Sequence, residues 1–345
     1  FANNPVTQDS FDLFFADTTA PFAVPGTVTV DPDPRSTAVG VVTVNFSEPV
    51  TGVNLTDFVL SRDGANVSLT GLTVNEVTPS QYTIDLNLVT GASGDYVLSI
   101  QGTNSLIFDL AGNPIQTGLI GLDSWTVESI GPTASLSIPS PRMTAANDLT
   151  VSFTKPVDVT QVDLTDLRLE LDAGGGFVEI PITGGSVTPG GAGAFEDTFT
   201  VDISGDTATE GTYRVTLVAS DSGIVDQAGI ELGADASTTF SVDTTAPRVD
   251  IIDIAPDPRN SAVGLVNILF DEDVTGLDLA NAETDFNLLF DDGLGGGQMA
   301  VSLASLTVTQ ETARRYTIDL STLTTIQGDY ELQIVSNTGI QDIAG

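Results

Sequence analysis

Cysteine and histidine are both absent from this chain of 345 residues. Without cysteine the chain can form no disulfide framework and offers no thiolate to a metal. Without histidine it lacks the usual general base, the usual activator of serine and cysteine nucleophiles, and the commonest zinc ligand. These absences remove several large classes of hydrolase and metalloenzyme, and we expect no enzymatic activity.

Positive charge is scarce as well. Lys155 is the only lysine, and 10 basic residues stand against 47 acidic ones, for a formal net charge of −37. Such a field repels nucleic acid and anionic membranes, so neither is an expected partner. The chain contains no apolar stretch that reaches the roughly 20 residues of a membrane-spanning helix. The same charge opposes a compact fold unless cations are bound.

The residues that are abundant favour strands. Val, Thr, Ile and Leu dominate, and 34 glycines and 17 prolines punctuate the chain. Short runs in which every second residue is apolar predict half-buried strands. Several short strands in each unit predict an all-β fold of antiparallel sandwiches. The clearest runs are residues 42–46, 82–86 and 96–100, with counterparts at 149–153, 199–203 and 213–217, and at 266–270, 316–320 and 330–334.

A repeat runs through the chain three times. A Gly-x-Tyr motif recurs at equal intervals, and a tetrad Asp-x-Ala-Gly follows each copy. A fixed period indicates one structural unit used many times. We predict that each tyrosine hydrogen-bonds back to the preceding corner, as a tyrosine does in immunoglobulin-like sandwiches. The tyrosines are Tyr96, Tyr213 and Tyr330, and the tetrads are residues 109–112, 226–229 and 342–345.

Short linkers divide the repeats. Each linker begins with an acidic residue and ends with a proline, at residues 17–21, 128–132 and 243–247. Proline restricts its own backbone and that of the preceding residue, so these links are expected to be short and stiff. The predicted domains are residues 17–127, 128–242 and 243–345, and the third lacks its closing strand.

Residues 1–16 align with the closing strand of a repeat. Phe14 stands where Trp125 and Phe240 stand in the two complete repeats, a position we assign to the core rather than to a sugar platform. One expectation is that the chain is a window of a longer array. The other is that residues 1–16 complete the third domain of a neighbouring copy, because an unpaired edge is a template for strand addition and head-to-tail insertion builds a filament. The interface residues would be Phe11, Leu13, Phe14 and Phe15.

Several motifs resemble the bacterial Ig-like repeats of large secreted and cell-surface proteins. They are the Asp-Thr-Thr-Ala-Pro linkers at 17–21 and 243–247, residues 45–50 and residues 109–113. The resemblance covers the whole chain. It implies tandem sandwiches that extend adhesins, surface layers or filaments away from the cell, often with calcium at domain junctions. It also implies a bacterial origin and an extracellular or cell-surface location.

Acidic residues are expected to converge where the chain enters each domain, because the linker and two loops meet at that pole of an immunoglobulin-like sandwich. Oxygen ligands from several loops, without histidine or cysteine, suit calcium. In the second repeat Lys155 replaces the residue at the position of Glu48, which puts a full site there in doubt. The alternative is that these acids cap turns and face water. The candidate ligands are Asp17, Glu48, Asp57 and Asp109 in the first repeat, Glu128, Asp166 and Asp226 in the second, and Asp243, Glu272, Asp273, Asp285 and Asp342 in the third.

The expected function is that of an extracellular structural protein. It would be a stiff, acidic rod or filament of Ig-like repeats that binds calcium and contacts copies of itself or adjacent repeats of a longer chain. The alternative is the stalk or a ligand-binding segment of a giant adhesin, which would need one repeat to differ and to expose aromatic residues. A glycosidase would use one pair of carboxylates about 5–10 Å apart, whereas the acids here recur in every repeat.

Overall fold

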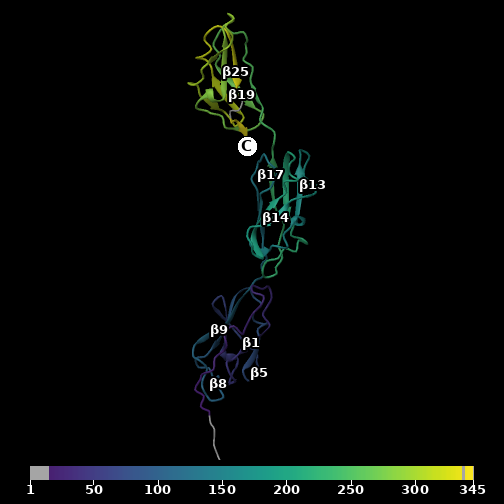
Figure 1. The fold of residues 1–345 in the computed structure, drawn as a ribbon, viewed down its shortest axis with the longest axis vertical. Helices are drawn as coiled ribbons and strands as arrows, with labels where there is room; N and C mark the ends of the chain where they lie inside the picture. Colours follow the sequence, from purple (N-terminus) through teal and green to yellow (C-terminus); the bar gives the residue numbers. More distant parts are fainter. Residues whose placement is uncertain (1–14, 336–338, 345) are drawn as a thin grey trace, which may run out of the picture.

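The computed structural model describes residues 15–335 and 339–344. Three β-sandwich domains follow one another along the long axis of the molecule, joined by single linkers (Figure 1). Each domain has a separate buried hydrophobic cluster, drawn from residues 23–127, 134–242 and 249–340. The predicted fold class is confirmed: the chain is an elongated array of tandem immunoglobulin-like antiparallel sandwiches.

In the first domain a sheet of order β1-β6-β5 packs against a sheet of order β4-β3-β7-β9. Strands β2 and β8 form a separate two-stranded sheet. Every strand pair in the domain is antiparallel. Its elements are β1 (Val41–Asn45), β2 (Val50–Thr51), η1 (Leu55–Asp57), β3 (Phe58–Arg62), β4 (Ala65–Val67), β5 (Val74–Thr78), β6 (Gln81–Asp85), β7 (Gly94–Gln101), β8 (Phe108–Asp109) and β9 (Leu119–Val127).

In the second domain two four-stranded sheets pack against each other, one of order β10-β11-β15-β14 and one of order β13-β12-β16-β17. Its elements are β10 (Ala134–Ser137), β11 (Leu149–Asp158), η2 (Leu164–Asp166), β12 (Leu167–Asp172), β13 (Val178–Ile180), β14 (Ser186–Pro189), β15 (Phe195–Asp202), β16 (Gly211–Leu217) and β17 (Ala236–Val242).

In the third domain a sheet of order β18-β19-β24-β23 packs against a three-stranded sheet of order β22-β21-β25. Strands β20 and β26 form a separate two-stranded sheet. Its elements are β18 (Val249–Ile251), β19 (Leu265–Phe270), β20 (Val274–Thr275), η3 (Ala282–Thr284), β21 (Phe286–Asp291), β22 (Met299–Val301), β23 (Val308–Gln310), β24 (Arg315–Asp319), β25 (Asp329–Ile334) and β26 (Gln341–Asp342).

The predicted alternation places side chains in the core as expected. In β19, Val266, Ile268 and Phe270 are buried, whereas Leu265 and Leu269 between them are exposed. Successive side chains of a strand point to opposite faces, so every second residue enters the space between the two sheets. The same pattern holds in the first and second domains and yields the three hydrophobic clusters.

The predicted tyrosine corner is confirmed in all three domains. The hydroxyl of Tyr96 donates to the carbonyl of Ala92 at 2.8 Å, and that of Tyr213 donates to Thr209 at 2.7 Å. The hydroxyl of Tyr330 donates to the carbonyl oxygen four residues upstream at 3.1 Å. Each bond fastens the turn before the strand to the strand itself, so the motif has a structural role.

The glycine of each Gly-x-Tyr motif is required by its backbone. Gly211 has φ +147°, and a Cβ atom there would lie 2.8 Å from the carbonyl oxygen of Asp172. Gly328 has φ +157°, and its Cβ would lie 2.3 Å from the ring of Phe290. A side chain at either position would therefore strain the backbone and collide with the neighbouring strand.

The closing strand covers the tyrosine in the two complete domains. Trp125 of β9 lies opposite Tyr96, and Phe240 of β17 lies opposite Tyr213. The rings stack with centroids 5.6 Å and 5.1 Å apart. Trp125 and Phe240 are both buried, which confirms that this aromatic position belongs to the core.

In the third domain, the structure as described gives β25 a partner, β21, on one side only. Tyr330, Leu332 and Ile334 of β25 are only half-buried, whereas their counterparts in the second domain are fully buried. Of the predicted interface residues, Phe15 is 91% exposed. Phe11, Leu13 and Phe14 lie outside the described residues.

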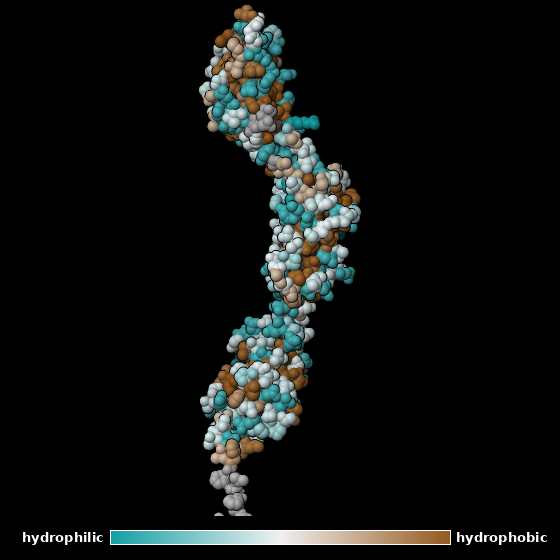
Figure 2. Space-filling model, viewed as in Figure 1, coloured by the Kyte–Doolittle hydropathy of each residue, from teal (hydrophilic) through white to brown (hydrophobic). Residues whose placement is uncertain are grey.

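The described part of the chain contains no helix with the length and apolarity needed to cross a membrane. The helical segments within residues 15–335 and 339–344 are three single 3-10 turns, each capped by an Asn or Asp. Hydrophilic residues line most of the waist between the first and second domains on the face shown in Figure 2.

Candidate metal centres

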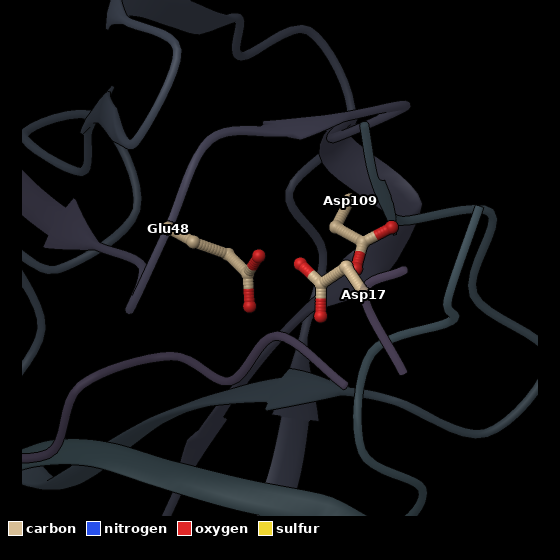
Figure 3. Close-up of side chains that lie close together, drawn as sticks. All are labelled: Asp17, Glu48 and Asp109. Carbon is tan, nitrogen blue, oxygen red and sulfur yellow. The ribbon is translucent and has the colours of Figure 1, made fainter. Parts of the chain in front are cut away.

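Three carboxylates meet where the chain enters the first domain. Asp17 comes from the linker, Glu48 from the turn between β1 and β2, and Asp109 from β8. One carboxylate oxygen from each lies within 4.8 Å of the others. Figure 3 shows the side chains of Asp17 and Glu48 directed toward each other, with Asp109 beside them.

The local sequence explains why these side chains converge. Val50 of β2 pairs with Asp109 of β8, which carries the preceding turn and Glu48 toward that aspartate. Asn113 fixes the aspartate: its backbone N–H donates to Oδ1 of Asp109, and its side-chain Nδ2 donates to Oδ2, each at 2.7 Å. The same Nδ2 donates to the carbonyl of Asp17 at 3.1 Å, and so joins the linker to the loop. We had not predicted a role for Asn113, although it ends the Asp-Leu-Ala-Gly-Asn motif.

The charges in this cluster are unbalanced. Burial raises the pKa of Glu48 above its usual value, and the negative charges of Asp17 and Asp109 raise it further. Burial also raises the pKa of Asp109, but hydrogen bonds from Asn113 and from backbone N–H groups of the tetrad outweigh this and hold the pKa below its usual value. Asp109 therefore stays ionised, and Glu48 bears the repulsion that a cation would relieve.

The third domain repeats this arrangement with residues at equivalent positions. Asp243 of the linker, Glu272 and Asp342 of β26 each place one oxygen within 4.8 Å of the others. Val274 pairs with Asp342 as Val50 pairs with Asp109. Burial raises the pKa of Glu272, and the neighbouring aspartates raise it further, against a smaller opposing effect of an arginine.

The second domain has a lysine in the corresponding place. The Nζ atom of Lys155 lies 2.5 Å from Oε2 of Glu128 and 3.5 Å from Oδ2 of Asp226. It also donates to the carbonyl of Ile130 in the linker at 2.6 Å. The structure thus brings the predicted residues Glu128 and Asp226 together around an ammonium group of the chain itself.

Asp57 and Asp166 do not join these clusters. Each closes a capping box at a 3-10 turn, at η1 and η2. Oδ2 of Asp57 accepts the backbone N–H of Asn54 at 2.8 Å, and its Oδ1 accepts the hydroxyl of Ser105 at 2.8 Å. Oδ2 of Asp166 accepts the backbone N–H of Asp163 at 2.9 Å. These carboxylates cap turns, as the alternative expects, but both are buried and do not face water.

Asp285 and Asp273 also lie outside the clusters. Oδ2 of Asp285 accepts the backbone N–H of Asp278 at 2.6 Å, and the side chain is fully buried. Oδ1 of Asp273 accepts a hydrogen bond from Nε of Arg314 at 2.7 Å. Among the described residues, the two clusters that could hold a metal ion therefore contain six of the predicted ligands. Asp57, Asp166, Asp273 and Asp285 have structural roles instead.

Comparison with known proteins identifies no family. No family model matches the chain, and no curated protein matches it. Among solved structures, a segment of alpha-2-macroglobulin from Escherichia coli that spans domains MG0-NIE-MG1 aligns over 88% of this chain and 98% of the segment, at 10% identity and a TM-score of 0.25. A titin segment aligns over 94% of this chain and 95% of its own, at 13% identity and a TM-score of 0.25.

The N-terminal part of the bacterial S-layer protein SbsC aligns over 65% of this chain, at 13% identity and a TM-score of 0.23. The chain spans only 44% of that S-layer structure. Likenesses this distant carry no argument about function. The functional argument therefore depends on the geometry of the clusters and of the third domain.

Proposed function

We propose that this chain is a non-enzymatic structural segment of an extracellular rod or filament. Calcium fastens the linker to the first and third domains, and a strand from a neighbouring copy completes the third domain. The observation that carries the proposal is the pair of equivalent three-carboxylate clusters, each placed where a linker enters a sandwich.

The chemistry of the clusters favours calcium over other divalent ions. Calcium takes oxygen ligands in flexible geometry at about 2.3–2.6 Å, whereas zinc and copper sites normally use histidine or cysteine, and this chain contains neither. Carboxylate oxygens within 4.8 Å of one another can reach a single ion with small side-chain movements. Backbone carbonyls and water would supply the remaining ligands. Modules outside the cell bind calcium with dissociation constants of about 0.1–1 mM.

Calcium at these positions would stiffen the rod. Each cluster joins one linker residue to two residues of the following domain, so an ion bound there holds the linker against that domain. Elsewhere the linker after the second domain is held by polar contacts, including a 2.6 Å hydrogen bond from Thr245 to Glu210. Removal of the ion would leave these contacts and restore the carboxylate repulsion.

Calorimetric titration with calcium tests this part of the proposal. We expect the full chain to bind one ion per cluster, and Glu48→Gln and Glu272→Gln each to lose one. Glu179→Gln is a matched control, because Glu179 is an exposed carboxylate outside both clusters. Absence of calcium binding at millimolar concentrations, or equal loss in the control, would contradict the proposal.

The third domain supports the second part. Among the described residues, β25 has no partner strand on the side that corresponds to the edges of β7 and β16, which β9 and β17 cover in the other domains. The half-buried Tyr330 corresponds to Tyr96 and Tyr213, each of which stacks on an aromatic residue of the closing strand. We propose that residues 1–16 of a neighbouring copy pair with β25 and place Phe14 against Tyr330. Backbone hydrogen bonds would supply affinity and the aromatic pocket would supply register.

Sedimentation of the full chain tests this assembly. We expect mass to rise with protein concentration, and deletion of residues 1–16 to give monomers only. A synthetic peptide of residues 1–16 should then bind the shortened chain, and Phe14→Ala in the peptide should weaken binding. A full chain that stays monomeric, or a peptide that does not bind, would contradict strand exchange between copies.

A further inference from the structure

We propose that Lys155 is a built-in cation that takes the place of calcium in the second domain. The linker between the first and second domains would then stay fastened without calcium, while the linkers entering the first and third domains depend on the ion. This inference rests on the proposed calcium sites, because it assigns one of three equivalent positions to a different cation.

The three positions are equivalent in sequence and in structure. Glu48, Lys155 and Glu272 each lie two residues after a buried phenylalanine in or directly after a core strand. Two residues after each of them, a valine pairs with the aspartate that begins the tetrad: Val50 with Asp109, Val157 with Asp226, and Val274 with Asp342. The linker supplies the third group each time, from Asp17, Glu128 or Asp243.

The charge balance is the same with either cation. One ammonium against two carboxylates leaves one negative charge, and a divalent ion against three carboxylates also leaves one. The substitution of lysine for glutamate therefore removes a ligand and supplies a charge in a single step. Ammonium provides three donors. Lys155 donates to Glu128 and to the carbonyl of Ile130, and its Nζ forms an ion pair with Oδ2 of Asp226 at 3.5 Å.

The burial of Asp226 shows why a cation is needed. Its side chain is only 2% exposed, and loop amides of Ala228 and Ile230 donate to Oδ1 at 3.0 and 2.9 Å. Oδ2 is buried and has only the ammonium of Lys155 nearby as a charged partner in the described structure. An unpaired buried carboxylate is costly, so loss of the lysine would leave that charge unbalanced.

The ammonium remains charged at neutral pH. Burial lowers the pKa of Lys155, but the hydrogen bond and charge of Glu128 and the charge of Asp226 outweigh burial and raise the pKa above its usual value. The linker also fits closely against the second domain: a Cβ at Gly131 would lie 2.2 Å from the carbonyl oxygen of Glu231. The fastened linker is therefore held by both charge and shape.

Distance measurements between introduced labels can separate the two linkers. The chain has no cysteine, so paired cysteines carry spin labels without interference. Leu88, Val178 and Leu294 are 84%, 65% and 86% exposed in the first, second and third domains. Leu88→Cys with Val178→Cys reports on the linker between the first and second domains (residues 128–132), called the first linker in these measurements. Val178→Cys with Leu294→Cys reports on the linker between the second and third domains (residues 243–247), called the second linker.

In the otherwise wild-type chain, EDTA should broaden the distance distribution across the second linker and leave that across the first unchanged. Lys155→Met should broaden the first distribution with or without calcium. Lys155→Glu should broaden it in EDTA and narrow it again with calcium, and titration should then find one more bound ion than in the wild type. Calcium rescue of Lys155→Glu also shows that the variant is folded.

Two results would overturn the inference. The first is broadening across the first linker in EDTA as large as that across the second. The second is a Lys155→Met chain whose first linker stays as ordered as in the wild type. If calcium instead fails to bind the wild type at all, the calcium proposal fails, and the Lys155→Met measurement still decides whether the lysine fastens its linker.

Discussion

Substitution of Glu48 by glutamine should stabilise the first domain without calcium and destabilise it with calcium. In EDTA the wild-type carboxylate lies near Asp17 and Asp109, and its pKa is raised first by burial and then by the negative charges of these two aspartates. A carboxyl whose pKa is raised in the folded state loses stability as pH rises through that pKa, which here lies above 4.5. The advantage of glutamine in EDTA should therefore be present at pH 7 and disappear below pH 4.5.

The stabilisation expected from the proposed calcium ion follows from its binding equilibrium. A ligand that binds only the folded state at a hundredfold excess over its Kd stabilises by about 2.7 kcal/mol. For a domain of about 100 residues each kcal/mol is worth roughly 4–8 °C, so saturation should raise the Tm of the wild-type domain by about 10–20 °C. The glutamine variant keeps two of the three carboxylates, and we expect it to retain less than half of that rise.

The fluorescence of Trp125 provides the assay. It is the only tryptophan in the chain, it is 2% exposed, and it stacks on Tyr96 in the first domain. Its emission during heating therefore reports on the first domain alone. Glu179→Gln is again the control, because Glu179 lies in the second domain. The reasoning would be refuted if the glutamine variant melted below the wild type in EDTA at pH 7, or if both gained equally from calcium.

Three further predictions concern the packing of the sandwiches and can be measured as shifts in calorimetric transitions. Tyr213→Phe removes the donor to the carbonyl of Thr209 and should cost about 1 kcal/mol. Phe240→Ala empties a buried position stacked on the same tyrosine and should cost about 3–5 kcal/mol. Gly328→Ala places a Cβ at φ +157° against the ring of Phe290 and should destabilise the third domain by about 1–3 kcal/mol. Transitions that stay within experimental error of the wild type would contradict each of these assignments.

The strands could be predicted because burial on one face leaves a direct trace in the sequence. A run such as Val266-Asn267-Ile268 alternates only when one face is buried, and the structure places it in β19. The tyrosine corner could be predicted because its glycine and tyrosine occupy fixed positions relative to one turn. Both features depend on neighbours within a few residues, which is the range over which sequence patterns are informative.

The membership of the carboxylate clusters could be predicted only in part. Asp57 and Asp109 are both buried acids of the first domain, yet one closes a capping box and the other faces the linker. Composition does not separate these roles, since each carboxylate is drawn inward by backbone N–H groups. The spacing Asn54-x-x-Asp57 is a capping pattern that favours the first role. The sequence does not tell which group the second carboxylate oxygen of each aspartate faces, because that depends on how two loops distant in the sequence meet.

Comparison of the three domains separates the requirements of the fold from those of the linkers. The glycine and tyrosine of the corner are the same in every repeat, and backbone geometry and one hydrogen bond favour them at these positions. Next to the linker acid, Glu48, Lys155 and Glu272 of the domain body occupy equivalent positions. Opposite charges can do so only if the constraint acts on the sum of the charges rather than on any one residue. The buried aspartate of the tetrad is constant. Lys155 balances its negative charge in the second domain, and under our proposal calcium balances it in the other two.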